Sequence, residues 1–424
     1  MTVGIVGLGI AGLRAAQLLE RQGVNVRLYE ARNRLGGRMH TVAEDGAVFE
    51  SGGEWIDADH HRFMSLLREH GLEPLAPPDF PRHYLYRDER CSSENLWQDV
   101  MEDDLRVEGA AREICRSLTT PPWVNLHASK LEARTLGDFL RANTRSERGL
   151  WWLTATYRSD EGDDPDNIGL LGWLSGYLQY LNRDGNEMSA FRVPGGSSQL
   201  FKRMAARLTE EPRLGSRLRR LEQDGQGVTL DFDQARERVE RVILTMPPSA
   251  LEHVVFDPPL NSSKRCAIEA CGMSRAIKLS WQFDQPWWLE YGWGGSMICD
   301  SPLQQLWDAT LGEAPVMSAY ICGRAAEEWL SLPDPVSAGL YELSRLYPVA
   351  NDHFVKGWVH DWISDPFSGG AFSHLAPGYV LDHMEHIAPP EGRVHFAGEH
   401  TATWTGFIEG ALESAERVVA EVLA

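Results

Sequence analysis

Cysteine is scarce in this sequence, and its pattern excludes the common cysteine-based sites. The 424 residues include six cysteines, none in a CxxC pair or at zinc-ligand spacing from histidines. We therefore expect no metal and a reducing, cytoplasmic environment. The adjacent His60 and His61 do not form a ligand set with His70, and a histidine pair in a loop is expected to be exposed.

Long apolar runs are also missing. The most apolar uncharged stretch, Ile168 to Leu181, is too short and too rich in glycine to span a bilayer. The chain enters an apolar strand at Val3 without a basic leader, and it stops at Ala424. We expect no membrane association.

Basic residues are too few to balance the acidic ones. Lys plus Arg is 41 and Asp plus Glu is 61, which gives a net charge of −20. Such a field repels nucleic acid and attracts cations. With 43% hydrophobic residues, the chain is apolar enough to fold, and its length allows two or three domains.

The first thirty residues have the pattern of a βαβ unit. A β-branched run at Val3 to Val6 leads into GLGIAG, a helical pattern that ends near Gly23, and a second strand at Asn25 to Glu30. The spacing of Gly7, Gly9 and Gly12 is the GxGxxG of dinucleotide-binding turns.

Each part of this unit has a chemical purpose. Its glycines allow a tight turn and a close approach to pyrophosphate, and the helix that includes Ala11 presents free N–H groups to phosphate. Glu30 is placed to accept hydrogen bonds from a ribose diol, which disfavours a 2′-phosphate. In the loop that follows, Arg32 and Arg34 precede Arg38, whose guanidinium could neutralise the pyrophosphate.

The rest of the chain indicates two interleaved domains. Helical segments broken by proline occupy roughly 74–190, strand patterns return at 217–230 and 239–246, and further strands are expected at 277–283 and 316–321. A strand at 394–397 and an amphipathic helix at 407–423 end the chain. We predict a cofactor-binding domain of 1–75, 190–271 and 363–424, and a substrate-binding domain of 76–189 and 272–362.

Six motifs in order give the chain a resemblance to a known family. They are GLGIAG at 7–12, the strand-end acid Glu30, RLGGR at 34–38, SGGEW at 51–55, PGGSSQL at 194–200 and FAGEHTATWTGFIEGA at 396–411. This set resembles the flavin-containing amine oxidase family, which includes monoamine, polyamine and L-amino-acid oxidases. The resemblance implies an α/β fold with a Rossmann-like FAD-binding domain and an α+β substrate-binding domain. It also implies FAD, an amine substrate and dioxygen.

The resemblance also assigns residues to roles. Lys278 is similar to the family lysine that holds a water near the flavin, although a lysine in a strand can equally point to solvent. Phe372 and Phe407 correspond to an aromatic pair beside the flavin, where they could sandwich an amine. Trp55 and Trp362 are assigned to the substrate. Further cofactor contacts are expected at Gly53, Glu54, Leu218, Glu399, Gly406, Phe407 and Ile408.

Two departures from the family pattern refine the prediction. Ala371 stands where covalent members carry cysteine, so FAD should be bound noncovalently. Trp55 stands where amino-acid oxidases place a carboxylate-binding arginine, which weakens the amino-acid interpretation unless Arg62 or Arg158 substitutes. The acidic segment 161–166 is expected to be a solvated helix start, and it could instead guide polyamines.

The sequence thus predicts an FAD-dependent oxidase that converts an amine to an imine and dioxygen to hydrogen peroxide. The alternatives are an L-amino-acid oxidase, a flavin-dependent desaturase or isomerase on the same fold, and a scaffold that binds FAD only for structure. A homodimer is possible, and nucleic acid is not an expected partner.

Overall fold

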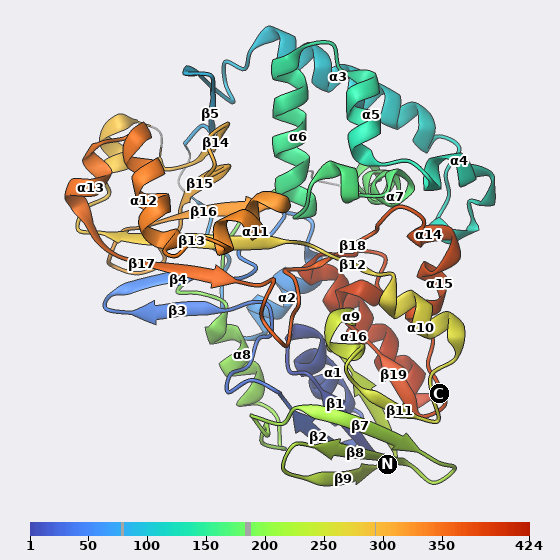
Figure 1. Cartoon of the computed structure of the whole chain (residues 1–424). Coiled ribbons are helices and arrows are strands. Elements are labelled where there is room, and N and C mark those ends of the chain that lie inside the picture. The colour runs from blue at the N-terminus through green and yellow to red at the C-terminus, as the bar shows by residue number, and fades with distance from the viewer. Residues whose placement is uncertain (78–79, 183–187, 293) are drawn as a thin grey trace.

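The structure is a computed structural model that describes residues 1–77, 80–182, 188–292 and 294–424. Figure 1 shows two connected parts. One contains both termini and a parallel sheet, and the other contains a larger sheet and a group of helices. Each part is built from several chain segments, as the sequence predicts for an α/β protein. The exact division into two domains stays a prediction.

The parallel sheet forms around the first strand of the chain. Its order is β19 (Val394–Phe396), β10 (Arg241–Leu244), β1 (Thr2–Val6) and β2 (Asn25–Tyr29). Apolar β1 is central and nearly all buried, which its Val/Ile-rich sequence favours. Helices α1 (Ile10–Arg21) and α16 (Ile408–Leu423) pack together beside it, so the first and last helices of the chain share one core.

A second sheet packs against the parallel sheet. Its order is β11 (Val255–Asp257), β7 (Leu218–Gln223), β8 (Val228–Phe232) and β9 (Arg236–Val239). The alternating pattern at 217–230 therefore forms a hairpin. Its apolar side chains, such as Leu230, share a core with Val6 and Val242 of the parallel sheet.

The seven-stranded sheet joins two distant stretches of the chain. Its order is β17 (Phe354–Asp361), β13 (Ala276–Phe283), β16 (Val316–Cys322), β15 (Gln305–Asp308), β14 (Met297–Cys299), β5 (His83–Tyr86) and β6 (Glu89–Ser92). Ile277, Leu279 and Trp281 share a core with α12 (Pro335–Leu346) and α11 (Arg324–Leu330). By alternation, Lys278 and Ser280 face the opposite side of the sheet.

The stretch predicted as helical segments forms several helices, but also the hairpin β5–β6. Its longer helices are α3 (Gln98–Cys115), α5 (Leu136–Asn143), α6 (Glu147–Glu161) and α7 (Leu170–Leu181). Ser146 caps α6 by accepting a hydrogen bond from the Gly149 N–H. In Figure 1, α6 descends from this group toward β16, which it contacts.

The remaining elements connect these parts. The helices are α2 (His61–Glu69), α4 (Ser129–Glu132), α8 (Ser198–Ala205), α9 (Pro248–Leu251), α10 (Ser262–Glu269), α13 (Val349–His353), α14 (Tyr379–Asp382) and α15 (Met384–Ile387), and the strands are β3 (Thr41–Glu44), β4 (Ala47–Glu50), β12 (Gly272–Met273) and β18 (Ser373–His374). Among the described residues, no helix combines the length and the apolarity needed to cross a membrane.

The acidic segment 161–166 does not begin an α-helix, and its last residues enter only the short 3₁₀ helix Pro165–Asn167. Helix α6 ends at Glu161, Gly162 adopts the left-handed conformation after it, and the next α-helix begins only at Leu170. Asp163 is buried and pairs with Arg275 at 2.6 Å. The expectation of a solvated helix start is wrong, because the segment is a turn fixed by a buried ion pair.

The expected exposure of the paired histidines is half wrong. His61 is exposed, but His60 is buried at the start of α2, where Asp57 and Asp59 place their carboxylates near its ring. The turn before α2 folds these side chains inward.

Candidate active site

A cavity of about 500 Å³ extends from the glycine turn after β1 to the seven-stranded sheet. Its lining brings together every predicted site residue except Gly12, although their roles stay predictions. These lining residues are Gly7, Gly9, Ala11, Glu30, Arg32, Arg38, Gly53, Glu54, Trp55, Leu218, Lys278, Trp362, Phe372, Glu399, Gly406, Phe407 and Ile408.

The glycine turn forms the closed end of the cavity. Gly7 has a φ of +96°, which an L side chain rarely adopts. A Cβ on Gly12 would lie 2.0 Å from the Gly7 carbonyl oxygen, so Gly12 permits close packing rather than lining the cavity. Helix α1 begins after Gly9 without a side-chain cap or an acidic residue in its first turn. Its N–H groups thus remain available for phosphate.

Glu30 is fixed at the end of β2. Its buried carboxylate accepts hydrogen bonds from the backbone N–H groups of Leu8 at 2.7 Å and Arg32 at 2.8 Å. Each oxygen keeps a lone pair free, because one carboxylate oxygen can accept two hydrogen bonds. The glycine cradle, the uncapped helix and this carboxylate fit the phosphates and the ribose of a dinucleotide.

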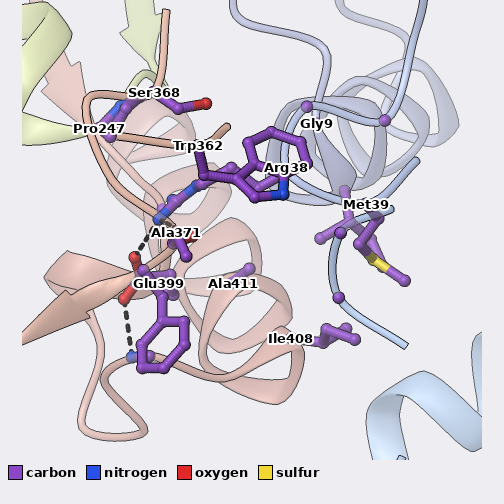
Figure 2. A pocket seen from close by; sticks show the side chains of 18 of the residues that line it. Gly9, Arg38, Met39, Pro247, Trp362, Ser368, Ala371, Glu399, Ile408 and Ala411 are labelled. Atoms are coloured by element: carbon purple, nitrogen blue, oxygen red, sulfur yellow. Dashed lines mark hydrogen bonds and ion pairs between the residues drawn. The ribbon is translucent and has the colours of Figure 1, made fainter. Parts of the chain in front are cut away.

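Arg38 and Glu399 join the two ends of the chain at the cavity wall. Arg38 donates to Glu399 at 2.7 Å (Figure 2). Glu399 also accepts from the Gly406 N–H at 2.7 Å and from the Ser373 N–H at 3.1 Å. Burial raises the pKa of Glu399, but Arg38, His400 and Ser373 outweigh burial and hold that pKa below its usual value. Arg38 therefore forms an ion pair with a protein carboxylate, in addition to its predicted contact with the pyrophosphate.

Two other predicted residues hold loops in place. Arg32 pairs with Asp365 at 2.6 Å and donates to Ser368 at 2.7 Å, so it fixes the segment before Ala371. Trp362 donates from its indole N–H to the Ser51 carbonyl at 2.8 Å.

Lys278 points into the cavity and not to solvent. The side chain is 8% exposed, and its ammonium donates to the Gly52 carbonyl at 2.8 Å, the Glu50 carbonyl at 3.2 Å and the Glu54 carboxylate at 3.0 Å. Strand alternation turns it away from the apolar core of Ile277 and its neighbours. A buried charge needs such partners, and Lys278 has three.

Glu54 is the centre of this polar cluster. Besides Lys278, it contacts the Trp307 indole N–H at 3.1 Å and the Arg192 guanidinium at 3.3 Å. Arg192 in turn lies over the Trp55 ring at 5.2 Å. The sequence analysis missed Arg192 and Trp307, because neither stands in a motif that the resemblance covers.

The two predicted phenylalanines line the cavity from different segments. Phe407 precedes α16 and packs edge-on against the His60 ring, with centroids 5.7 Å apart. Phe372 follows Ala371 and lies against Gly162, where a Cβ would come within 2.6 Å of its ring. Within the part of the chain that the structure describes, the two rings do not contact each other.

The arginines proposed as carboxylate partners are engaged elsewhere. Arg62 pairs with Glu409 and Glu416, Arg158 pairs with Asp164, and neither lines the cavity. Arg82 does line it.

The sequence analysis missed a further set of cavity residues that come from α6, the start of β5 and the large sheet. They are Arg82, Thr156, Ser159, Asp160, Ile298, Gln305 and Tyr320. Only Tyr320 carries a usable sequence signal, because it lies in a predicted strand. Its pairing with Lys278 follows from the register of β13 and β16.

Comparison with known proteins decides the family. A family model described as flavin containing amine oxidoreductase matches residues 10–423. The chain belongs to this family. It is an oxidoreductase that acts on amines, and FAD is its cofactor, which the site geometry fits.

Known proteins that are similar to the chain differ in their substrates. An L-amino acid dehydrogenase of Synechocystis sp. is 25% identical over 446 residues, which cover 99% of this chain and 94% of the relative. The cyclohexylamine oxidase structure from Brevibacterium oxydans IH-35A has a TM-score of 0.90 at 25% identity and covers 99% and 98% of the two chains. A wild-type putrescine oxidase bound to putrescine also has a TM-score of 0.90 at 25% identity, with 100% and 99% covered.

Proposed function

We propose that this enzyme oxidises a primary amine to an imine and reduces dioxygen to hydrogen peroxide. The amine loses two electrons and two protons, dioxygen gains them, and water then hydrolyses the imine to an aldehyde and ammonia. The observation that carries the proposal is one continuous cavity, which has a glycine turn and Glu30 at one end and a buried lysine with two phenylalanines along its wall. Membership of an enzyme family removes the scaffold alternative.

The residues of this chain orient the amine and keep it dry. The rings of Phe372 and Phe407 offer apolar faces on which an amine can lie while water is excluded. Glu54 and two backbone carbonyls fix the ammonium of Lys278 at the cavity wall. Bound FAD supplies the redox chemistry, namely acceptance of a hydride equivalent from the substrate carbon. The amine must bind in its deprotonated form. It can lose the proton to water before it binds, so no protein base is required.

We propose that FAD is held noncovalently, because Ala371 offers no thiol before Phe372. Acid precipitation of the yellow protein should leave the flavin in the supernatant, measured by absorbance. Flavin that stays in the pellet would show a covalent link at another residue.

We propose that amines are preferred over the matching amino acids. Trp55 lies where amino-acid oxidases place arginine, and a carboxylate buried without a cation is strongly disfavoured. The value of kcat/KM for phenylethylamine should exceed that for phenylalanine, and both should rise above neutral pH because alkylamines have a pKa near roughly 10.4. Faster turnover of phenylalanine would contradict this preference.

One observation favours L-amino-acid oxidation as a second candidate. Arg82 lines the cavity and makes no ion pair with any described residue, so it could receive a carboxylate. Under this candidate, Arg82→Gln would abolish turnover of amino acids and leave amines unaffected. A desaturase or isomerase would instead form little peroxide, which a peroxidase-coupled assay measures directly.

A further inference from the structure

Asp160 is a carboxylate in the cavity that has no partner. It lies in the last turn of α6, lines the cavity and is open to the space inside it. In the described part of the chain, Asp160 makes no hydrogen bond and no ion pair, whereas Asp163 and Asp164 nearby are both paired. The side chain of Asp160 is exposed to this space, so its carboxylate oxygens are available to accept hydrogen bonds from a cationic ligand.

The surroundings of Asp160 favour a cation. A helix C-terminus carries a partial negative charge, and Asp160 adds a full one at the end of α6. One turn earlier on the same face, the hydroxyl of Thr156 is buried and has no hydrogen-bond partner among the described residues. Thr156 also lines the cavity. An ammonium group can donate three hydrogen bonds, and this wall supplies acceptors for them.

Other charges near Asp160 leave the region acidic. Among the described residues, Arg82 is the cation that acts on its carboxyl, and no ion pair joins the two. Asp57 opposes its ionisation, and Glu161 is the adjacent carboxyl. Burial raises the pKa of Asp160 to about 6, with Arg82 lowering it and Asp57 raising it. The carboxyl is therefore mostly ionised above neutral pH, where the enzyme is expected to work.

The register of the large sheet places Asp160 away from Lys278. Lys278 pairs with Tyr320 on β16, and Tyr320 pairs with Gln305 on β15. Two strand spacings separate Lys278 from Gln305, about 9.6 Å. The hydroxyl of Ser159, next to Asp160, hydrogen-bonds Gln305. The two nitrogens of an extended five-carbon diamine lie about 7.5 Å apart, and a hydrogen bond of about 2.8 Å to a carboxylate extends this span to about the same distance.

We propose that Asp160 binds the distal ammonium of an α,ω-diamine while the other amine is oxidised near Lys278 and the phenylalanine pair. This inference rests on the proposed function and names its substrate class. It identifies Asp160 as a specificity residue that touches substrate but takes no part in the electron transfer. A monoamine with the same carbon chain would lose only this contact.

The test compares 1,5-diaminopentane with pentylamine in the wild-type holoenzyme and in Asp160→Asn. A hydrogen bond between charged groups is lost in the variant, so its kcat/KM for the diamine should fall on the order of 10²-fold. Its kcat/KM for pentylamine should stay within about threefold of wild type, because pentylamine has no second ammonium and loses no charged contact in the variant. The rate of anaerobic flavin reduction, measured against diamine concentration, should show a weaker substrate affinity in the variant and an unchanged limiting rate.

Two further variants keep the result interpretable. Asp160→Glu carries the charge one methylene further into the cavity and should shift the preference toward 1,4-diaminobutane. Asp138→Asn on the surface of α5, where Asp138 pairs with Arg141, should change neither substrate. Retention of the diamine preference in Asp160→Asn, or an equal loss for both amines, would overturn the proposal.

The same assay separates this inference from the proposed function. If wild type oxidises pentylamine and shows no preference for the diamine, the role of Asp160 is wrong and amine oxidation stands. If none of the amines reduces the flavin of the wild-type enzyme but an amino acid does, the preference for amines and the diamine site are both overturned. Arg82→Gln then identifies the carboxylate partner.

Discussion

The cofactor end and the substrate end of the cavity are built in different ways. At the cofactor end, Gly7, Gly12 and Glu30 lie within 24 consecutive residues, and one βαβ unit positions them. At the substrate end, Lys278, Asp160 and Tyr320 come from three elements that meet only through sheet register and helix packing. A local motif therefore fixes the glycine turn and Glu30 at the predicted cofactor end, whereas tertiary structure alone brings together the residues of the predicted substrate end.

The largest expected effect tests the local end. Gly12→Ala places a Cβ 2.0 Å from the Gly7 carbonyl oxygen, so helix α1 must move away from the turn. Overpacking of this kind costs about 1–3 kcal/mol of unfolding free energy. It also displaces the N–H groups that face the phosphates. Purified Gly12→Ala should lose most of its FAD, measured by the ratio of flavin to protein absorbance.

A glycine at an open helical position is the matched control. A Cβ on Gly176 in α7 meets nothing within 4 Å, so Gly176→Ala should keep full FAD content and gain about 0.5–1 kcal/mol of stability. Equal FAD content in Gly12→Ala and wild type would show that the turn tolerates a side chain, and the comparison between the two ends would lose its basis.

The sequence predicted the fold and the cofactor end because short-range patterns encode them. Alternation and glycine spacing locate β1, α1 and β2 without knowledge of the rest of the chain. The same signals could not place Asp160, whose neighbours in sequence suggested a solvated segment. Its position depends on where α6 ends, on the left-handed Gly162 and on the buried pair of Asp163 with Arg275.

Lys278 marks the intermediate case. Alternation along β13 left two orientations open, and only the resemblance favoured the cavity. The choice is physical, because Glu54 and two carbonyls stabilise the ammonium there, while the opposite face of β13 packs against α12. The orientation of the Lys278 side chain is therefore set by Glu54, which lies in a distant segment, and not by the strand pattern.

The next effect in size tests Lys278 at the substrate end. Lys278→Met removes a charged donor from the cavity and keeps a similar volume, so FAD should be retained. Turnover should fall on the order of 10²-fold, as when one preorganised donor is removed from an active site. Rapid kinetics of flavin reduction and reoxidation would show which half-reaction slows. Wild-type rates in both would leave Lys278 with a structural role only.

Lys356→Met provides the control on the neighbouring strand. Lys356 lies on β17 opposite Gln282 and pairs with Glu44 and Asp45 at the surface. Exposed pairs contribute at most about 1 kcal/mol. Its replacement should leave both half-reactions unchanged, which separates the loss of any lysine on this sheet from the loss of the cavity lysine.

The smallest effect is a pH dependence of substrate preference. The pKa of Asp160 is raised to about 6, chiefly by burial, so its carboxyl is ionised above that pH and neutral below it. The ratio of kcat/KM for 1,5-diaminopentane to that for pentylamine should therefore be constant near pH 8 and fall about tenfold toward pH 5. Both reacting amines lose a proton with nearly the same pKa, so that requirement cancels in the ratio, while the distal ammonium stays charged throughout. Asp160→Asn should give a ratio that does not change with pH. If wild type also gives a constant ratio, the tail of the diamine is recognised without an ionised carboxylate, and the substrate end discriminates by shape alone.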